Sequence, residues 1–332
     1  MESEIYIDLG TANTLVMDRD LGLVANEPSV IAFQELSNGS RRIIAVGGEA
    51  KKKLGRTPGN LQASHPLRNG VIAELDATEA MLRYFLGFAP KKVVRPRMVI
   101  SLPYGVSDIE KKAVRDCGLH AGAREVILIE EPMAAAIGSG LPVKDSRGSM
   151  IIDIGGGTTE VAIISLCGIV HCEAIRIGGH RLDEAIVDHI RRQYNVVIGD
   201  QSAEKLKISI GTAIPSDPPK SDYVRGIDFS TGLPKEVLVT SNDVFEAIDP
   251  LLRDIIDAAK KAFEQTPPEL LGDLIEHGLL LAGGGALIND IDRRLAKELE
   301  IPVARSADPL LAVALGGAMS LRDPELLEKS SI

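Results

Sequence analysis

The sequence predicts an α/β protein made of two related halves. Short apolar, strand-like runs alternate with helical stretches along the chain, a pattern typical of this class. One motif occurs twice, almost half the chain apart. The 332 residues are 45% apolar and 25% charged, an ordinary globular balance that excludes a disordered or collagen-like chain. This length suits two domains of ordinary size.

The individual elements follow from local signals. Apolar runs bounded by polar residues predict strands at Ile5–Leu9, Val99–Leu102, Val126–Ile129, Met150–Ile154, Val161–Ser165 and Leu279–Ala282. Capping residues and early prolines predict helices. These are a helix from the Ser107/Glu110 capping box toward His120, Pro132–Ser139, Ser202–Ile210, one from Ser241 to about Phe263, one opened by Thr266 with Glu269 and Pro267, and Leu287–Leu299.

Charge and cysteine content limit the function. The formal charge is −10 and the isoelectric point is about 5.2, so we expect no nucleic-acid partner. A nucleotide held by backbone amides and a metal remains compatible with this charge. Three cysteines (Cys117, Cys167 and Cys172) fit a reducing cytosol. The acidic start Met1–Glu4 does not fit a signal peptide, and the apolar stretches are too short to span a bilayer.

The repeated motif predicts two equivalent hairpins. Ile7–Val16 aligns with Ile152–Val161, and the two copies share Ile, Asp, Gly, Thr and Val at aligned positions. Each copy is an apolar strand that ends in an aspartate, a Gly/Thr-rich turn, and a second apolar strand. Two such halves suggest two polar tips that face each other across a cleft.

These tips have the chemistry of a phosphate site. Backbone amides at glycine-rich turns can approach phosphates closely. Asp8 and Asp153, at the strand ends, could hold Mg²⁺ directly or through water, because Mg²⁺ prefers a few carboxylates together with water and phosphate oxygens. For either copy alone an ordinary hairpin turn is the alternative, but the repetition favours the phosphate interpretation.

A third glycine cluster, Gly283–Ala286, follows the predicted strand Leu279–Ala282 and precedes a predicted helix. A strand, a glycine turn and a helix N-terminus form a common nucleotide-contacting geometry. The cluster lacks the Lys-Ser/Thr ending of a P-loop, and a tight strand-to-helix turn is the alternative.

The two hairpins and the late glycine turn together resemble the phosphate and adenosine motifs of the actin superfamily, which includes actin, heat-shock chaperone ATPases and sugar kinases. Longer matches make the chain similar to the MreB family of bacterial actin homologues, over nearly its whole length. These segments are Asp8–Leu15, Asn26–Val30, Leu54–Asn60, Gly70–Ala73, Ile129–Ala136, Gly148–Glu160, Thr266–Leu270 and Ala307–Leu310.

The resemblance implies an actin-like fold, with two ribonuclease-H-like domains and two smaller inserted subdomains around an interdomain nucleotide cleft. Domain I would cover residues 1–145, with a small subdomain at about 33–65 and the C-terminal residues 315–332 returning to it. Domain II would cover residues 146–314, with a small subdomain at about 182–245. The implied cofactors are ATP and Mg²⁺.

The resemblance also assigns site residues. Phosphates would lie against Gly10, Thr11, Ala12 and Asn13 of the first hairpin and against Gly155, Gly156, Gly157 and Thr158 of the second. The adenine and ribose would contact Gly283, Gly284, Gly285 and Ala286, and also Glu204, Lys205, Leu206 and Lys207 of a predicted helix. Without the resemblance, Glu204 and Lys207 read as an ion pair on a solvated helix face.

Glu131 is the best candidate for a catalytic residue. It follows the strand Val126–Ile129 and precedes a Pro-started helix, so its carboxylate lies at the C-terminal end of a strand, where α/β sites gather. The resemblance implies that it orients the water attacking the γ-phosphate, together with Thr158. The alternative is an acid that complements the helix dipole, which is the better explanation for Glu130.

Two further features remain outside this picture. Cys167, His171 and Cys172 look like metal ligands, but Cys172 would point away from the other two on a strand. His180 follows Gly178 and Gly179, where the family usually has an aspartate, and this departure concerns interdomain or filament contacts.

A membrane contact is expected from Tyr84–Pro90, which matches a hydrophobic loop of the family. Lys91, Lys92, Arg95 and Arg97 follow it, and apolar residues beside basic ones suit an anionic membrane surface. The alternative is a buried helix end with solvated lysines. The amphipathic N-terminal helix of many relatives has no counterpart in Met1–Glu4.

We therefore expect an ATP-hydrolysing, actin-like protein that forms filaments. The implied role is a cytoskeletal scaffold for cell shape, peripheral at the inner face of the cytoplasmic membrane, with cell-wall synthesis proteins as partners. The alternatives are a non-polymerising kinase and a chaperone-type ATPase of the same fold.

Overall fold

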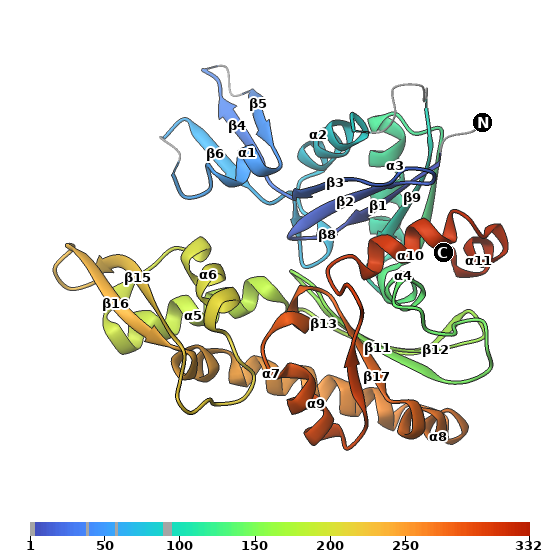
Figure 1. Ribbon diagram of the computed structural model, residues 1–332. Coiled ribbons are helices and arrows are strands. Elements are labelled where there is room, and N and C mark those ends of the chain that lie inside the picture. The colour runs from blue at the N-terminus through green and yellow to red at the C-terminus, as the bar shows by residue number, and fades with distance from the viewer. Residues whose placement is uncertain (1–3, 38–39, 57–58, 89–94) are drawn as a thin grey trace.

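The computed structural model describes residues 4–37, 40–56, 59–88 and 95–332. Within these residues the chain forms two mixed five-stranded sheets, one above the other in Figure 1, with helices between them and on their outer faces. The helices that separate the sheets are α4 (Glu131–Gly138) and α10 (Ala312–Ser320). This is the α/β class that the sequence predicts.

The first sheet has the order β10-β9-β1-β2-β3. Its strands are β1 (Glu4–Leu9), β2 (Asn13–Asp18), β3 (Gly22–Pro28), β9 (Arg97–Leu102) and β10 (Glu125–Glu130). Strand β1 pairs antiparallel with β2, which places Asp8 opposite Leu15. On its other edge β1 pairs parallel with β9, and there Asp8 lies beside Ser101.

The second sheet repeats this arrangement, with the order β13-β12-β11-β17-β18. Its strands are β11 (Ser149–Ile154), β12 (Thr159–Ser165), β13 (Gly168–Ile175), β17 (Leu279–Ala282) and β18 (Val303–Arg305). Strand β11 pairs antiparallel with β12, so Asp153 lies opposite Glu160, and it pairs parallel with β17. The two predicted hairpins are therefore β1–β2 and β11–β12, and their aspartates occupy equivalent strand ends.

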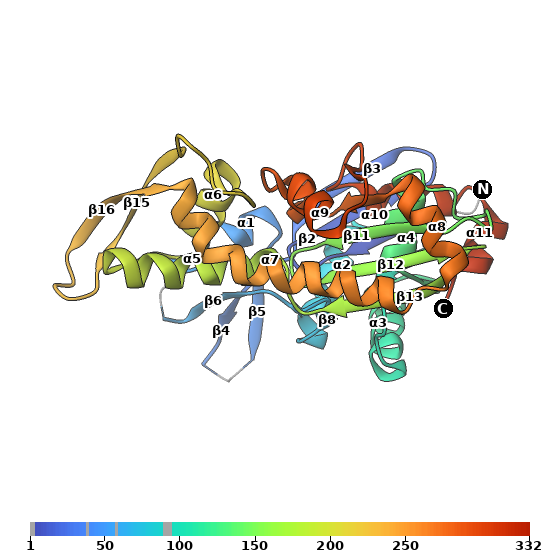
Figure 2. The same cartoon turned by 90° about the horizontal axis from the view of Figure 1, so that it is seen from below.

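Two smaller sheets lie on the same side of the molecule (Figures 1 and 2). One contains β4 (Ile31–Glu35), β5 (Arg41–Val46) and β6 (Leu61–Ser64), and it packs against the short helix α1 (Gly48–Lys51). The other contains β14 (Val196–Val197), β15 (Ser221–Asp228) and β16 (Pro234–Thr240) beside α5 (Gly179–Tyr194) and α6 (Asp200–Ile210).

The remaining helices cover the outer faces. On the first sheet, buried apolar residues of α2 (Leu75–Leu86) and α3 (Asp108–Ala121) join those of β1 and β9 in one core. The long helix α7 (Ser241–Glu264) runs along the second sheet (Figure 2). The other elements are β7 (Leu67–Arg68), β8 (Val71–Ile72), α8 (Pro268–His277), the 3₁₀ helix η1 (Gly284–Leu287), α9 (Ile291–Leu299) and α11 (Pro324–Ser330).

Glycines allow α4 and α10 to pack backbone to backbone. A Cβ atom at Gly138 would lie 1.9 Å from the carbonyl oxygen of Ala312, and one at Gly316 would lie 1.8 Å from that of Ala134. At the next residue, a Cβ on Gly317 would lie 2.1 Å from the Tyr6 ring. No larger residue fits these three positions without moving a helix or the ring.

The structure corrects two predicted helix starts. Thr240, not Ser241, caps α7, and it forms a capping box with Asp243, while Ser241 hydrogen-bonds Ser216. The predicted box at Thr266 is wrong, because its hydroxyl donates to the Ala262 carbonyl of the preceding helix (2.6 Å). The Ser107/Glu110 capping box is confirmed.

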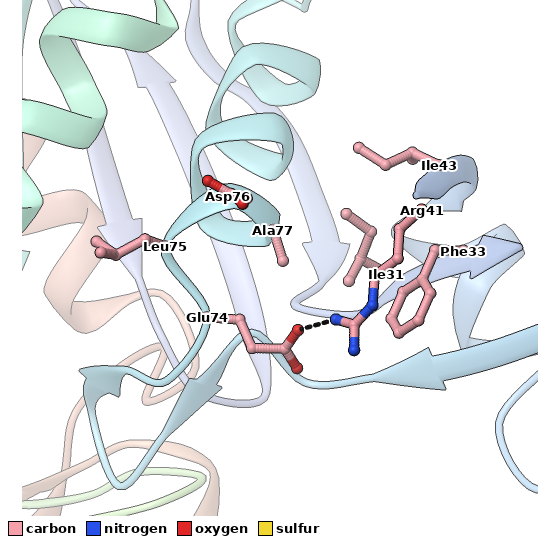
Figure 3. A pocket seen from close by; sticks show the side chains of 8 residues that line it. All are labelled: Ile31, Phe33, Arg41, Ile43, Glu74, Leu75, Asp76 and Ala77. Carbon is pink, nitrogen blue, oxygen red and sulfur yellow. Dashed lines mark hydrogen bonds and ion pairs between the residues drawn. The ribbon is translucent and has the colours of Figure 1, made fainter. Parts of the chain in front are cut away.

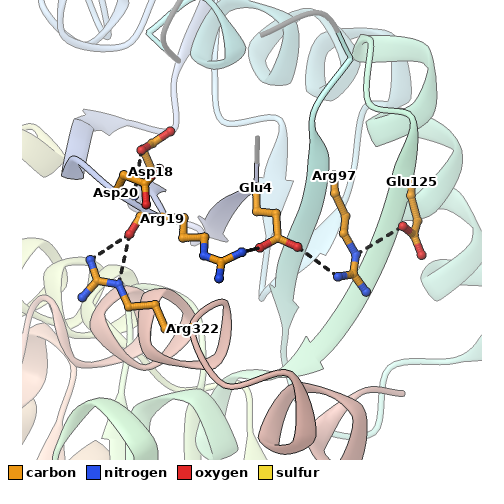
Figure 4. A network of polar contacts seen from close by, with 7 residues as sticks. All are labelled: Glu4, Asp18, Arg19, Asp20, Arg97, Glu125 and Arg322. Carbon is orange, nitrogen blue, oxygen red and sulfur yellow. Dashed lines mark hydrogen bonds and ion pairs between the residues drawn. The ribbon is translucent and has the colours of Figure 1, made fainter. Parts of the chain in front are cut away.

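A charged network fastens the end of β1 that is remote from Asp8 (Figure 4). Glu4 accepts from Arg19 (2.6 Å) and Arg97 (3.0 Å), and Arg97 also pairs with Glu125 (3.2 Å). Arg322 donates to the carbonyl of Arg19 from the C-terminal part of the chain. This network corrects one sequence expectation, because Arg97 is engaged with carboxylates and does not face a membrane as a free cation.

Candidate functional site

Among the described residues, four carboxylates point into the junction between the two sheets. Asp8 lies on the face of β1 that also carries Tyr6, and Asp153 and Glu160 lie on the face of the second sheet that carries Ile151 and Ala162. Both faces pack on α4, which begins with Glu131. The structure thus brings the predicted residues Asp8, Asp153 and Glu131 together, and it adds Glu160.

Burial in this junction dominates the electrostatics of the cluster. Loss of water, followed by the charge of Asp153, raises the pKa of Asp8 to about 7, whereas a hydrogen bond from Ser101 (3.4 Å) opposes the shift. Burial likewise raises the pKa of Asp153 to about 7 and that of Glu160 to about 8. The pKa of Glu131 lies well above its usual range, through burial and then the charges of Glu160, Asp8 and Asp153.

Such a cluster suits a bound cation. Carboxylate oxygens are hard ligands for metal ions. Without a neutralising partner these carboxylates repel one another, and a divalent cation would offset this repulsion. Within the described part of the chain, no group of three or more His, Cys, Asp or Glu residues is arranged to hold a metal alone. Mg²⁺ needs no such group, because it keeps waters and takes phosphate oxygens as further ligands.

The two glycine-rich turns, which follow Asp8 and Asp153 in the sequence, contact each other. A Cβ on Gly156 would lie 2.6 Å from that of Ala12, and one on Gly157 would lie 2.7 Å from the Thr11 hydroxyl. Thr11 is itself held by the amide of Gly70, which donates to its hydroxyl (2.9 Å). Glycines therefore allow the backbones of the two turns to approach each other closely.

The inner residues of each turn are fixed by the turn itself. The Gly155 amide donates to the carbonyl of Thr158 (2.9 Å), which places the Thr158 side chain at the start of β12. A Cβ on Gly10 would lie 2.6 Å from the Asn13 carbonyl oxygen, so only glycine closes this turn as tightly.

The third glycine cluster lies against Asp153. Gly283 has a φ of +76°, and a Cβ there would lie 2.3 Å from the Asp153 carboxylate and 2.4 Å from the Ile154 carbonyl. Gly284 begins the 3₁₀ helix η1, while Gly285 and Ala286 are buried. The cluster thus borders the junction, but the predicted helix at Leu287–Leu299 begins only at Ile291.

The predicted nucleotide-contacting residues of α6 divide into two groups. Lys207 donates to the Gly179 carbonyl (2.9 Å) and pairs with Asp183 (2.8 Å), beside the second glycine turn. Glu204 pairs with Lys51 of α1 (3.0 Å). Leu206 is buried in the core of the second half and Lys205 is exposed, so neither side chain joins this group.

Polar contacts close the junction near α6. Besides the Lys51–Glu204 pair, Gln201 donates to the Lys51 carbonyl (3.0 Å). The rings of His65 and His180 lie 5.1 Å apart, and the amide of His180 donates to the Gly156 carbonyl (2.9 Å). Burial lowers the pKa of His180 to about 4, with the nearby charge of His65 adding to the effect. The unusual histidine is therefore a neutral interdomain contact.

Sequence reasoning missed Glu160 and His65. In the repeat, Glu160 stands where the first copy has Leu15, so a comparison of the two copies could have identified it as a carboxylate in a buried register. His65 carries no such signal, because it lies in no repeated motif. Its contact with His180 becomes visible only in the folded structure.

A separate cavity of about 660 Å³ lies away from this junction (Figure 3). It separates the small β4–β5 sheet from the start of α2. Its lining combines apolar side chains with an Arg41–Glu74 ion pair (3.2 Å), and it contains Ile31, Phe33, Arg41, Ile43, Glu74, Leu75, Asp76 and Ala77. None of the predicted site residues contributes to it.

The hydrophobic loop predicted to contact a membrane is only partly exposed. Phe85 is fully buried in the core beneath α2, so the interpretation as a membrane anchor is wrong for this residue and the buried-helix alternative holds. Tyr84 and Phe88 are 41% and 40% exposed. Ala89, Pro90, Lys91 and Lys92 lie outside the described residues. No helix in the described ranges is long and apolar enough to cross a membrane.

The repeated hairpins, the paired aspartates and the glycine turns around one junction define the class of actin-like proteins. Solved structures show the same fold. MreB5 of Spiroplasma citri bound to AMPPNP superposes with a TM-score of 0.92 at 34% identity, over 98% of this chain and 97% of that one. The MamK double helical filament superposes with a TM-score of 0.81 at 20% identity, over 96% and 99% of the chains.

The chain belongs to the MreB/Mbl family, whose family model, described as "MreB/Mbl protein", matches residues 2–329. The cell shape-determining protein MreB of Escherichia coli K12 is 47% identical over 323 residues, which cover 96% of this chain and 93% of that protein. The cell shape-determining protein Mbl of Bacillus subtilis 168 is 41% identical over 331 residues, or 99% and 98% of the two chains.

Proposed function

We propose that this protein is an actin-like cytoskeletal ATPase that binds ATP with Mg²⁺ between its two halves. The observation that carries the proposal is the meeting of two glycine-rich turns that follow a buried pair of aspartates. The similar MreB5 has been solved with AMPPNP and with ADP, which supports the same ligand class here. Relatives named for cell shape favour this role over the kinase and chaperone alternatives.

The proposed binding roles follow the geometry. Asp8 and Asp153 hold Mg²⁺, and the amides of Thr11, Ala12 and Asn13 face the phosphates opposite those of Gly155–Thr158. Bound Mg²⁺ supplies charge neutralisation for the phosphates and relieves the repulsion between the aspartates. The turn at Gly283–Ala286 and the Glu204–Lys207 face of α6 border the base and ribose.

The proposed hydrolysis uses Glu131 and Thr158. Phosphoryl transfer needs mainly an in-line nucleophile and charge stabilisation, so the protein's contribution is positioning. Glu131 is the first residue of α4, and in this proposal its carboxylate orients a water toward the terminal phosphate. Thr158, at the second turn, hydrogen-bonds the same water. The close packing of α4 on α10 fixes the helix that carries Glu131.

We further propose that the protein forms filaments and acts at the inner face of the cytoplasmic membrane with cell-wall synthesis proteins. MamK, of the same fold, has been solved as a double helical filament, which supports self-association. The proposed domain limits remain 1–145 and 146–314, with subdomains near 33–65 and 182–245.

Tyr84 and Phe88 are the exposed apolar residues for the proposed membrane contact. Phe88→Ser should reduce co-sedimentation of ATP-assembled protein with anionic vesicles, because a partly exposed aromatic side chain loses its apolar burial in the bilayer. Ile275→Ser, a change at an exposed apolar residue of α8 (65% exposed), is the control. Equal pelleting of both variants with vesicles would remove this contact from the proposal.

Sedimentation with and without ATP tests the proposed function as a whole. We expect Mg-ATP to drive the protein into the pellet and phosphate to be released. A protein that releases phosphate but stays in the supernatant at all concentrations would support the enzyme alternatives. A protein that binds no nucleotide by calorimetry would contradict the proposal itself.

A further inference from the structure

Glu160 breaks the symmetry of the repeat at a buried position. The first hairpin has Leu15 there, packed in the core between the sheets, whereas the second has a carboxylate that is only 1% exposed. Moving a carboxylate out of water costs free energy unless it is hydrogen-bonded or neutralised. The second half therefore retains a costly group in the place where the first half has an ordinary core residue.

The contacts of Glu160 span the junction. One carboxylate oxygen accepts from the backbone amide of Tyr104 at 2.5 Å, and Tyr104 lies in the loop between β9 and α3 of the first half. Hydrogen bonds to an ionised acceptor are among the stronger ones in proteins. Glu160 thus holds the first half with one oxygen, while its other oxygen is buried without a hydrogen-bond partner among the described residues.

Glu160 and Glu131 belong to elements that pack on each other at the junction. Glu160 lies opposite Asp153 on the sheet face that packs on α4, and Glu131 is the first residue of that helix. Among the neighbouring charges, that of Glu160 raises the pKa of Glu131 more than those of Asp8 and Asp153 do. Of these neighbouring carboxylates, Glu160 therefore has the strongest electrostatic influence on Glu131.

We propose that Glu160 is a positioning residue for hydrolysis. Held by the Tyr104 amide, the buried Glu160 side chain fixes the orientation of the Glu131 side chain, and it does so only when the two halves are closed. The inference rests on the proposed ATPase function. It predicts that closure and the placement of Glu131 are coupled through one hydrogen bond. If Glu160 no longer fixes Glu131, nucleotide binding should remain intact but the attacking water would be misplaced. A misplacement of about 1 Å can cost about 100-fold in rate.

Two substitutions separate positioning from other roles. Glu160→Gln keeps the shape and an oxygen that accepts from Tyr104, while Glu160→Leu introduces the residue of the first repeat and removes the acceptor. We expect the Gln variant to release phosphate within about threefold of wild type. The Leu variant should lose about 10–100-fold in kcat, with affinity for Mg-ATP changed by less than about threefold. Glu173→Gln, on the adjacent strand β13, is the matched control.

Specific outcomes would overturn the inference. A normal kcat in the Leu variant would mean that Glu160 does not position Glu131. A Gln variant as slow as the Leu variant would mean that the loss in kcat comes from removing the ionisable group and not from losing the hydrogen bond. A loss in affinity as large as the loss in kcat would indicate a general binding defect. If the Leu variant fails to fold in a thermal melt, Tyr104→Pro replaces it, because proline removes the donor and leaves Glu160 intact. The same loss in kcat is then expected, and normal turnover would refute the positioning role of Glu160.

A second measurement is independent of hydrolysis. With AMPPNP bound, hydrogen exchange at the Tyr104 amide should be slow in wild type and in Glu160→Gln, and about tenfold faster in Glu160→Leu, because the acceptor is gone. If wild type binds nucleotide but releases no phosphate, the proposed function fails, and this exchange still decides the contact. Equal exchange in all three proteins would overturn the inference while the proposed ATPase function stands.

Discussion

Replacing Asp153 by Asn should stabilise the protein without nucleotide and weaken its binding of Mg-ATP. Burial raises the pKa of Asp153 from 3.8 to about 7, so the folded protein holds a proton that the unfolded chain releases above pH 4. The folded state therefore loses stability as pH rises from about 4 to about 7, and the full penalty persists above pH 7. Asparagine cannot ionise and removes this penalty.

The shift sets the magnitude. Converted in full, the rise in the pKa of Asp153 corresponds to a loss of about 4 kcal/mol in the free energy of unfolding at pH 8. The buried amide of Asn offsets part of this because it needs its own hydrogen bonds, so we expect a net gain of about 2–3 kcal/mol. That gain should raise the melting temperature by about 5 °C at pH 8 and be largely lost at pH 4, where Asp153 is protonated in the folded wild type and only partly ionised in the unfolded chain.

Urea unfolding of wild type and Asp153→Asn at pH 4 and pH 8 measures this difference. Asp254→Asn, at an exposed position on α7, is the matched control and should change stability little at either pH. Calorimetry should show weaker Mg-ATP binding in Asp153→Asn, because a proposed metal ligand is lost. A variant that is no more stable than wild type at pH 8, or whose advantage is the same at pH 4, would refute the reasoning.

Three further predictions follow from the site and its supports. Glu131→Ala should keep its affinity for ATP and lose most phosphate release, while the adjacent Glu130→Gln should turn over normally; normal release in the first would remove Glu131 from catalysis. Gly316→Ala should cost about 1–3 kcal/mol in urea unfolding, because its Cβ would meet the facing helix backbone, whereas Gly272→Ala in open space on α8 should be neutral or stabilising. His180→Asn should lose less stability than wild type between pH 6.5 and pH 4, by about 2 kcal/mol at pH 4.5, since the lowered pKa of His180 penalises the fold as pH falls through that window; parallel pH profiles would contradict this.

Local patterns predicted the parts of the site that lie at strand ends. Asp8 and Asp153 each follow an apolar run and precede a glycine turn, and both properties are encoded within about ten residues of sequence. The repeat predicted the antiparallel pairing within each hairpin and the two tips that face each other, but not the parallel pairing of β1 with β9 or of β11 with β17. The cap of α7 shows the limit of such reasoning, because Thr240 and Ser241 are adjacent and equally suitable, and only tertiary contacts of Ser241 decide between them.

Contacts between distant segments could not be predicted in the same way. Phe85 belongs to an apolar run beside basic residues, and sequence alone does not tell whether such a ring faces lipid or a core that is completed by β1 and β9. Glu160 and Tyr104 meet only because the two halves close on each other. The pairing of His65 with His180 likewise joins residues that share no local pattern.

The contacts near α6 have a kinetic consequence for nucleotide exchange. The Lys51–Glu204 pair, the Gln201 hydrogen bond and the contact between the tilted rings of His65 and His180 all join segments of the two halves near α6. We expect a nucleotide bound at the proposed site to leave only after these contacts break, so that its dissociation follows a first-order opening step. The release rate is then independent of the concentration of competing nucleotide and sets the lifetime of each bound state.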